Sequence, residues 1–509
     1  MSASTERKLR KAAREAGTDK KTLALEEEAK KKAKSKQRWT LGTIAVILLI
    51  AVILFLDSGF LYKNTTALTI GDQKYSPAEV NYYYANEYIT TANQYGNYAS
   101  AFGLDTSTGL SGLDKQDNPM GDGTWKDTFL DSAKNTMVQM KALTDYAKAN
   151  DISLDEEDLA NVDASFEGLD DYARAQGFAG ADAFFAVNYG TGVNQKIVRQ
   201  ATMDQTLASK AYNAVYDQTE YTAEELEEYY QSLDGSRDVY DYAYYHVDAA
   251  VAEGEDAPSE AAMTEARAEA DAIVYAYKDG ADIEDLQERF AVAVDTDELG
   301  REPTVASGRT IASVPAAFSD WLSADRQAGD VTVADDDSGC YVVLFLSRSD
   351  NHYNTVNVRH ILIKAEAGED GSFSDEAKAA AKARAEEILA QWQAGDKTEE
   401  SFAALAEEYS EDTGSNTNGG LYENVYRGQM VEEFDAFCFG DRKSGDVAIV
   451  YGDNGNYAGY HVIYFVGEGP LYSEVIARSA KLSEDMSQWL TDLTSQYEAT
   501  EGFGFRFVG

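Results

Sequence analysis

The chain has 509 residues, enough for roughly three to four domains, and its two cysteines exclude a small disulfide-stapled fold. Its 89 acidic and 44 basic side chains leave a formal net charge of −45, the wrong sign for a protein that coats nucleic acid phosphates. Hydrophobic residues make up 44% of the chain, so the acidity does not indicate disorder and the domains are expected to fold.

The N-terminal part has the pattern of a basic tail followed by a membrane anchor. Residues 1–38 hold 13 Lys and Arg against six Asp and Glu, whereas the 17 residues 40–56 carry no charge and span roughly 26 Å as a helix. We therefore expect a transmembrane helix over residues 39–62 and a single-pass cell-membrane protein, with a cytoplasmic tail at 1–38 and an extracytoplasmic C-terminal bulk. A cleaved signal peptide is the competing interpretation.

Residues 63–235 are expected to form a mainly helical domain that begins with a β-hairpin. The hairpin closes at Gly71-Asp72, and Ser76 with Glu79 forms a capping box at the start of the following helix. The polar, glycine-rich stretch from Asn93 to Gly123 is typical of a long loop. The same capping pattern predicts two further helix starts, at Ser153 with Glu156 and at Thr222 with Glu225.

Residues 236–350 and 351–469 are expected to be two copies of one unit. AAFSDWLSADRQAGDVTV from Ala316 aligns without a gap with EEFDAFCFGDRKSGDVAI from Glu432. Each copy is predicted to contain a strand, a long helix, a second helix, a short helix and a two-stranded hairpin. Residues 470–509 are expected to hold an amphipathic helix and a tail, so the fold class is an α+β multidomain protein.

The second copy resembles the parvulin family of peptidyl-prolyl isomerases. The motifs that carry the resemblance are VRHILI from Val358, EESFAALAEEYSEDTGSNTNGG from Glu399, YRGQMVEEFDAFCF from Tyr426 and AGYHVIYF from Ala458. With a helical domain before it and a helix after it, the chain looks like the PrsA and SurA class of exported foldases. The resemblance implies an antiparallel sheet wrapped by helices, no metal and no cofactor. It also implies unfolded or newly exported proline-containing proteins as partners.

The family pattern implies an apolar pocket for the proline ring. Equivalents of Met430 and Phe434 line this pocket in the family, and the two residues share a helical face because they are four apart. The bond before a proline relaxes in tens of seconds over a barrier of about 20 kcal/mol. A dry pocket lowers this barrier without a covalent step, because the twisted amide is less dipolar than the planar amide.

Polar residues are expected behind this pocket. His360 and His461 lie on the first and last strands of the copy and are predicted side by side, linked to each other or to hydroxyls. Asp412 or Thr413 falls where the family carries an acid or a thiol, and the sequence does not choose between them. The substrate-binding set is completed by Tyr422, which replaces an apolar residue of the family at one pocket wall, and by Phe439.

The first copy departs from the family pattern. Aligning its strands places Tyr244 opposite His360, Tyr341 opposite His461 and Val314 opposite Met430, and His246 lies two positions along the strand. This copy is therefore expected to act as a binding module or as a spacer between domains, and not to catalyse isomerisation.

Other interpretations remain open. His360 and His461 could be core histidines, or could form a zinc site with Cys438 and Asp412, although no local ligand spacing supports a metal. The whole chain could act as a non-catalytic holdase. It could also be an envelope scaffold or adhesin that uses both copies as protein-binding modules.

Overall fold

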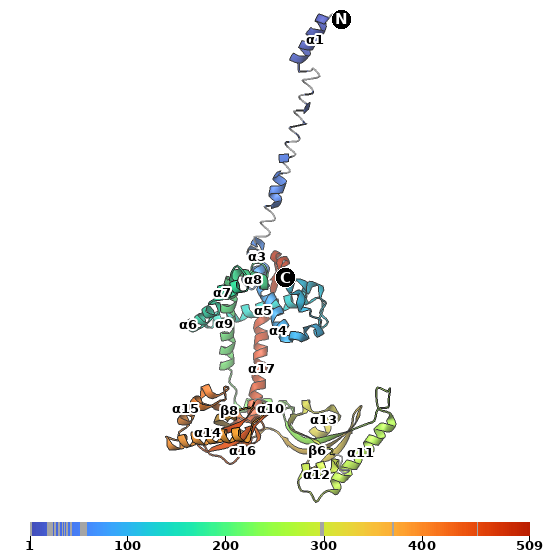
Figure 1. Ribbon diagram of the computed structural model, residues 1–509, viewed down its shortest axis with the longest axis vertical. Helices are drawn as coiled ribbons and strands as arrows, with labels where there is room; N and C mark the ends of the chain where they lie inside the picture. The colour runs from blue at the N-terminus through green and yellow to red at the C-terminus, as the bar shows by residue number, and fades with distance from the viewer. Residues whose placement is uncertain are drawn as a thin grey trace. The chain divides into compact units, whose positions relative to one another are not determined.

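The computed structural model describes residues 3–17, 59–295, 300–368, 371–455 and 457–509, together with scattered residues between 24 and 50. They fall into two compact units, shown by the ribbon in Figure 1. The first unit is Met1–Thr219 with Met486–Gly509, and the second is Glu220–Asp485.

A three-stranded antiparallel sheet joins the two chain segments of the first unit. Its strands are β1 (Leu68–Ile70), β2 (Gln73–Tyr75) and β11 (Ala499–Glu501), in the order β11-β1-β2. The predicted hairpin is confirmed, since β1 and β2 pair around Gly71, whose φ of +58° suits a residue without a Cβ. The pairing of β1 with β11 could not be read from the sequence, because the partners lie more than 400 residues apart.

Helices make up most of the first unit. Ser76 accepts a hydrogen bond from the Glu79 backbone amide and Glu79 accepts one from the Ser76 amide, which confirms the predicted capping box. The box expected at Ser153 is wrong, because the side chain of Asp155 caps this helix instead. The helices are α1 (Ala3–Glu15), α3 (Phe60–Asn64), α4 (Pro77–Tyr95), α5 (Trp125–Ala149), α6 (Glu156–Phe166), α7 (Leu169–Ala175), α8 (Ala181–Tyr189) and α9 (Gln195–Gln218).

The stretch expected as a loop between α4 and α5 contains three 3-10 helices. They are η1 (Gly96–Phe102), η2 (Thr106–Thr108) and η3 (Leu110–Lys115), and a further one, η6 (Phe503–Phe507), lies near the C-terminus. Tyr84, Trp125, Phe129 and Met137 are buried together in the core of this unit.

Two four-stranded antiparallel sheets with the same strand order make up most of the second unit. Their orders are β4-β3-β6-β5 and β8-β7-β10-β9, as the internal repeat predicts. The first sheet contains β3 (Val239–Asp248), β4 (Thr304–Thr310), β5 (Val331–Asp335) and β6 (Gly339–Ser349). The second contains β7 (Asn354–Lys364), β8 (Leu421–Val425), β9 (Val447–Asp453) and β10 (Ala458–Leu471). The edge strands β4 and β8 were not predicted, because neither has a clear alternation of apolar and polar residues.

The helices of the second unit follow the predicted order. They are α10 (Ala223–Ser232), α11 (Glu260–Asp279), α12 (Leu286–Val294), α13 (Ala316–Ser323), α14 (Asp375–Ala394), α15 (Glu399–Tyr409) and α16 (Glu432–Cys438). The Thr222 capping box starts α10 as predicted. The predicted C-terminal helix is α17 (Tyr472–Thr494), which continues from the second unit into the first.

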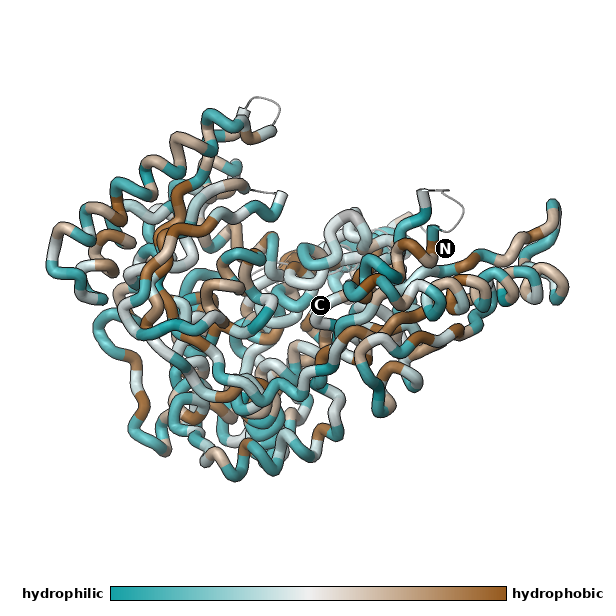
Figure 2. The backbone as a smooth tube through the Cα atoms, turned by 90° about the horizontal axis from the view of Figure 1, so that it is seen from below, coloured by the Kyte–Doolittle hydropathy of each residue, from teal (hydrophilic) through white to brown (hydrophobic). Residues whose placement is uncertain are grey.

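The alternation of side chains along β7 and β10 sends apolar residues to both faces of the second sheet. Ile361 and Val462 pack with α14 and α15 on one face. Val358 and Ile463 pack with α16 on the other. In Figure 2, extended segments carry runs of hydrophobic colour, whereas helical segments alternate between hydrophilic and hydrophobic colour. Because side chains alternate with a period of two, the even-numbered His360 joins Val358 on the α16 face, and His461 joins Ile463 there.

The predicted transmembrane helix and the single-pass cell-membrane localisation are wrong. No helix within the described part of the chain is both long and apolar enough to cross a bilayer. Residues 41, 42 and 51–58 of the predicted anchor lie outside the described residues.

Candidate functional site

Two buried histidines lie next to each other in the second sheet. β7 and β10 pair antiparallel with His360 opposite Ile463 and His461 opposite Leu362, so the two imidazoles are diagonal neighbours on one face. Their Nδ1 atoms are 3.1 Å apart and their rings are nearly parallel, at 16°. Both side chains are about 5% exposed or less, so water does not compete for these nitrogens.

A carboxylate completes the arrangement on the His360 side. Asp412 Oδ2 lies 2.8 Å from His360 Nε2 and accepts hydrogen bonds from the hydroxyls of Ser415 at 2.5 Å and Tyr422 at 3.0 Å. The hydrogen bond with His360, more than any other contact, holds the pKa of Asp412 well below its usual value. Thr413 is exposed, so of the two residues that the sequence left open, Asp412 is the one beside the imidazole.

His461 is held on its other side by a tyrosine. The hydroxyl of Tyr457 lies 3.0 Å from His461 Nε2. Burial, followed by the nearby imidazole of His360, lowers the pKa of His461 to about 3. A neutral imidazole carries one N–H, so His461 donates from one nitrogen and accepts at the other.

This single N–H leaves two consistent directions for the hydrogen-bond chain. In one, Tyr457 donates to His461, His461 donates from Nδ1 to His360, and His360 donates from Nε2 to Asp412. In the other, a His360 that carries both protons donates to Asp412 and to His461, which then donates to Tyr457. The direction of the hydrogen-bond chain therefore depends on which ring nitrogens carry hydrogen.

A small apolar pocket lies against this polar chain. Its volume is about 180 Å³, below the range of sites for drug-sized ligands and suited to one small ring. Met430 and Phe434 line it as the sequence predicted, and the ring of Phe434 meets both imidazoles edge to face at 5.6 and 5.3 Å. The other lining residues are His360, Leu362, Asp412, Tyr422, Val431, Tyr457 and His461.

One predicted binding residue lies elsewhere. Phe439 is absent from the pocket lining and packs against Tyr353 at 5.9 Å and under the guanidinium of Arg427 at 4.6 Å. Its side chain thus belongs to a neighbouring aromatic cluster.

Five residues of the site were missed by the sequence argument, and two of them, Leu362 and Val431, are apolar residues of the pocket wall. Ser415 and Tyr457 contribute hydroxyls, and Gly452 on β9 leaves room for His461. A Cβ added at Gly452 would lie 2.6 Å from His461 Nε2. The available signals were weak, because Ser415 is one of several hydroxyl residues in its loop and Tyr457 is one of 33 tyrosines.

The first copy has no imidazole pair at the equivalent place. Tyr244 pairs with Val343 just as His360 pairs with Ile463, which is the alignment that the sequence predicted. His246 instead pairs with Tyr341, and its two nitrogens lie 2.7 Å from Asp248 and 3.2 Å from Asp336.

The structure does not favour a metal at the imidazole pair. Cys438 is buried in the core beneath α16, where burial raises the pKa of its thiol to about 12. Within the described ranges, no group of three or more His, Cys, Asp and Glu side chains is placed to hold a metal ion.

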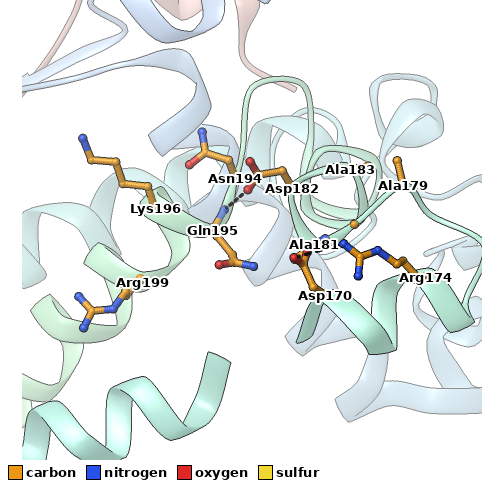
Figure 3. Close-up of a pocket in the computed structure, with 11 residues that line it drawn as sticks. Asp170, Arg174, Ala179, Ala181, Asp182, Ala183, Asn194, Gln195, Lys196 and Arg199 are labelled. Atoms are coloured by element: carbon orange, nitrogen blue, oxygen red, sulfur yellow. Dashed lines mark hydrogen bonds and ion pairs between the residues drawn. The ribbon is translucent and has the colours of Figure 1, made fainter. Parts of the chain in front are cut away.

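A larger hollow, of about 730 Å³, lies in the first unit between the starts of α8 and α9 (Figure 3). Both of its aspartates are already engaged with backbone amides. Asp170 accepts from the Ala181 amide, and Asp182 accepts from the Gln195 amide at 2.9 Å. The hollow is more open than the pocket beside the imidazoles and contains no imidazole, so that pocket is the better candidate for chemistry.

Comparison with known proteins agrees with this choice. Residues 341–467 match the PPIC-type PPIase domain family. The predicted resemblance to parvulin-type, PrsA- and SurA-like foldases is thereby confirmed over this segment. It contains the imidazole pair, Asp412 and the small pocket.

Comparison with individual proteins gives partial matches at low identity. The chain is 29% identical to the chaperone SurA of Alkalilimnicola ehrlichii over 260 residues, which cover 48% of this chain and 53% of that protein. It is 33% identical to foldase protein PrsA 1 of Listeria innocua over 124 residues, 24% of this chain and 34% of that one. The chain thus spans about half or less of these curated relatives. The crystal structure of PrsA from Bacillus subtilis aligns with 74% of this chain and 90% of its own, at 15% identity and a TM-score of 0.28.

Proposed function

We propose that the chain is a foldase whose second copy, residues 351–469, catalyses cis/trans isomerisation of the peptide bond before proline. The hydrogen-bonded chain from Asp412 through His360 and His461 to Tyr457, set behind a ring-sized apolar pocket, is the observation that carries this proposal. Residues 236–350 form a degenerate copy, and residues 63–235 together with 470–509 bind unfolded, proline-containing clients.

The pocket supports the reaction through burial and electrostatics. Met430 and Phe434 hold the proline ring, so that the chain on the other side of the bond can rotate. The planar amide has more negative charge on its oxygen than the twisted amide. The ionised Asp412, kept charged by its hydrogen bonds, therefore destabilises the ground state more than the transition state. Each 1.4 kcal/mol removed from the barrier increases the rate about tenfold.

The imidazoles act as positioning groups in this proposal. Neither ring needs to transfer a proton, because rotation about the amide bond makes and breaks no covalent bond. His360 fixes the carboxylate of Asp412, and His461 fixes His360, so the polar wall keeps its geometry while the substrate rotates.

The test is the isomerisation rate of a proline-containing tetrapeptide with the full chain. We expect His360→Ala and His461→Ala each to lower kcat/KM at least tenfold, which is about 1.4 kcal/mol. The chain offers matched controls in its two other histidines, because His246→Ala and His352→Ala lie outside the pocket and should retain the wild-type rate. A wild-type chain no faster than buffer would refute the isomerase and leave a non-catalytic holdase as the function.

A further inference from the structure

The carboxylate of the imidazole site is carried by a loop. Residues 410–420 connect α15 to β8 and include both Asp412 and Ser415, whose hydroxyl also lies 3.2 Å from His360 Nε2. A short 3-10 turn, η5 (Asn416–Asn418), lies within this loop. The way in which the loop is held against β7 therefore decides whether the Asp412 carboxylate reaches the imidazole.

Both ends of this loop are hydrogen-bonded to β7. The Glu411 amide donates to the Leu362 carbonyl at 2.9 Å, and the His360 amide donates to the Gly420 carbonyl at 2.9 Å. Gly420 has a φ of +71°, and a Cβ there would collide with the His360 carbonyl, so this close approach requires glycine. The loop thus returns to β7 at the same residue whose imidazole Asp412 holds.

Arg359 holds the end of this loop from the opposite face of the sheet. Its side chain points away from that of His360, because neighbouring residues of a strand face opposite sides. Its Nη1 donates to the carbonyls of Asn418 and Gly419, both at 3.0 Å, and its Nε donates to Glu399 Oε1 at 2.9 Å. The Arg359 side chain is 16% exposed, and hydrogen bonds from a charged donor are stronger than those from a neutral one.

We propose that Arg359 is a positioning residue of the imidazole site, which acts through the loop at residues 410–420 on the Asp412 carboxylate. Arg359 does not line the pocket, so its effect on a substrate is indirect. By binding two carbonyls it fixes where the loop turns back to β7, and Glu399 orients the guanidinium for this contact. This inference rests on the proposed isomerase function, in which the Asp412 carboxylate acts on the substrate amide.

The test is the imidazole NMR spectrum of the full chain labelled with ¹⁵N-histidine. The chain has only four histidines, so each signal is assigned by replacing one of them. Both directions of the hydrogen-bond chain place a proton on His360 Nε2, shared with Asp412. We expect Arg359→Met to speed the exchange of this proton with water at least tenfold, because a loosened loop releases it from the carboxylate. The signals of His246 and His352, which lie outside the pocket, should not change.

The matched control is Arg442→Met in the same copy. Arg442 Nε also donates to a backbone carbonyl, that of Phe437 at 3.1 Å, and its guanidinium lies 4.6 Å from the ring of that residue. The control variant thus loses similar contacts away from the loop, and its His360 proton should exchange as in the wild type. Exchange accelerated equally in Arg442→Met and Arg359→Met would overturn the proposal, since it would assign the effect to a general loss of stability.

Glu399→Ala is a second variant, which keeps Arg359 and changes a side chain that is 34% exposed. It removes the acceptor that orients the guanidinium, so the His360 proton should exchange at least threefold faster than in the wild type. Wild-type exchange in both Arg359→Met and Glu399→Ala would overturn the proposal. If Arg359→Met does not fold, the result with Glu399→Ala decides.

The isomerisation rate of a proline-containing tetrapeptide, measured on the same samples, separates this inference from the proposed catalysis. Arg359→Met should lower kcat/KM at least fivefold, because the carboxylate no longer keeps its place beside the pocket. A wild-type chain that does not isomerise would refute the isomerase, whereas faster proton exchange in Arg359→Met would still support the positioning of Asp412. An active wild type whose Arg359→Met variant exchanges this proton faster but keeps the wild-type kcat/KM would overturn the inference.

Discussion

Replacing Gly452 by Ala tests whether the position of His461 controls the proposed reaction. The new methyl would lie 2.6 Å from Nε2 and 2.9 Å from Cδ2 of His461, and 3.1 Å from Val431. The imidazole has little room to withdraw, because it is 4% exposed and packed between His360 and Phe434, with both ring centroids 5.3 Å away. Nε2, the atom that the methyl meets, is also the one that holds the Tyr457 hydroxyl.

The size of the effect follows from these distances. Relieving the contact to an ordinary separation requires a shift of about 1 Å in the imidazole or the strand. A misplacement of this size lowers the rate of an enzyme by up to about 100-fold, and overpacking destabilises a fold by about 1–3 kcal/mol. We therefore expect Gly452→Ala to lower kcat/KM for a proline-containing tetrapeptide by 10- to 100-fold, or about 1.4–2.7 kcal/mol.

The matched control is Gly467→Ala on β10. A Cβ at Gly467 meets nothing within 4 Å, so this variant adds the same methyl to the same sheet without a collision. Its rate should stay within twofold of the wild type. If Gly452→Ala also stays within twofold, the reasoning that His461 must hold this position is refuted.

Three further predictions concern the site and the first unit. Tyr422→Phe removes one hydrogen bond to Asp412, so kcat/KM should fall about three- to tenfold, and an unchanged rate would show that this hydroxyl is dispensable. The pKa of His461, lowered to about 3, means that only the unfolded chain gains this proton as the pH falls below about 6.5. Proton uptake by His461 in the unfolded chain therefore lowers the free energy of unfolding by about 2 kcal/mol at pH 5 relative to pH 8. In urea unfolding, the His461→Asn variant should lose less of its free energy of unfolding over this pH range than the wild type does. An equal loss of stability in the wild type and in the His461→Asn variant would contradict the lowered pKa of His461. Ser76→Ala removes the cap of α4 and should lower the protection of its first-turn amides against hydrogen exchange by about 1 kcal/mol, with no change in isomerisation rate.

Local patterns in the sequence determined much of the fold. A few neighbouring residues are enough to predict a turn or a helix cap, because turn and cap chemistry acts over that distance. This local signal predicted the hairpin at Gly71, the capping boxes at Ser76 and Thr222, and the C-terminal helix. The repeat likewise predicted the order of elements. The helical face expected to be shared by Met430 and Phe434 was wrong, because Met430 lies before the start of α16, although both residues line the pocket. Sequence patterning was misleading for the anchor at residues 39–62, where apolar composition alone did not establish a spanning helix in the described residues.

Only the tertiary structure decided which groups meet. Asp412 rather than Thr413 reaches His360 because the loop direction after α15, not the residue type, aims one side chain inward. Ser415 joins the site by meeting His360, which lies 55 residues earlier in the chain, whereas Tyr457 lies only four residues before His461 and still required the turn before β10 to direct its hydroxyl to the imidazole. β11 likewise pairs with β1, which lies more than 400 residues away along the chain, and no local sequence signal predicts that pairing. Local propensity depends on neighbours along the chain, whereas hydrogen bonding and burial depend on neighbours in space, which exist only once the sheets have formed.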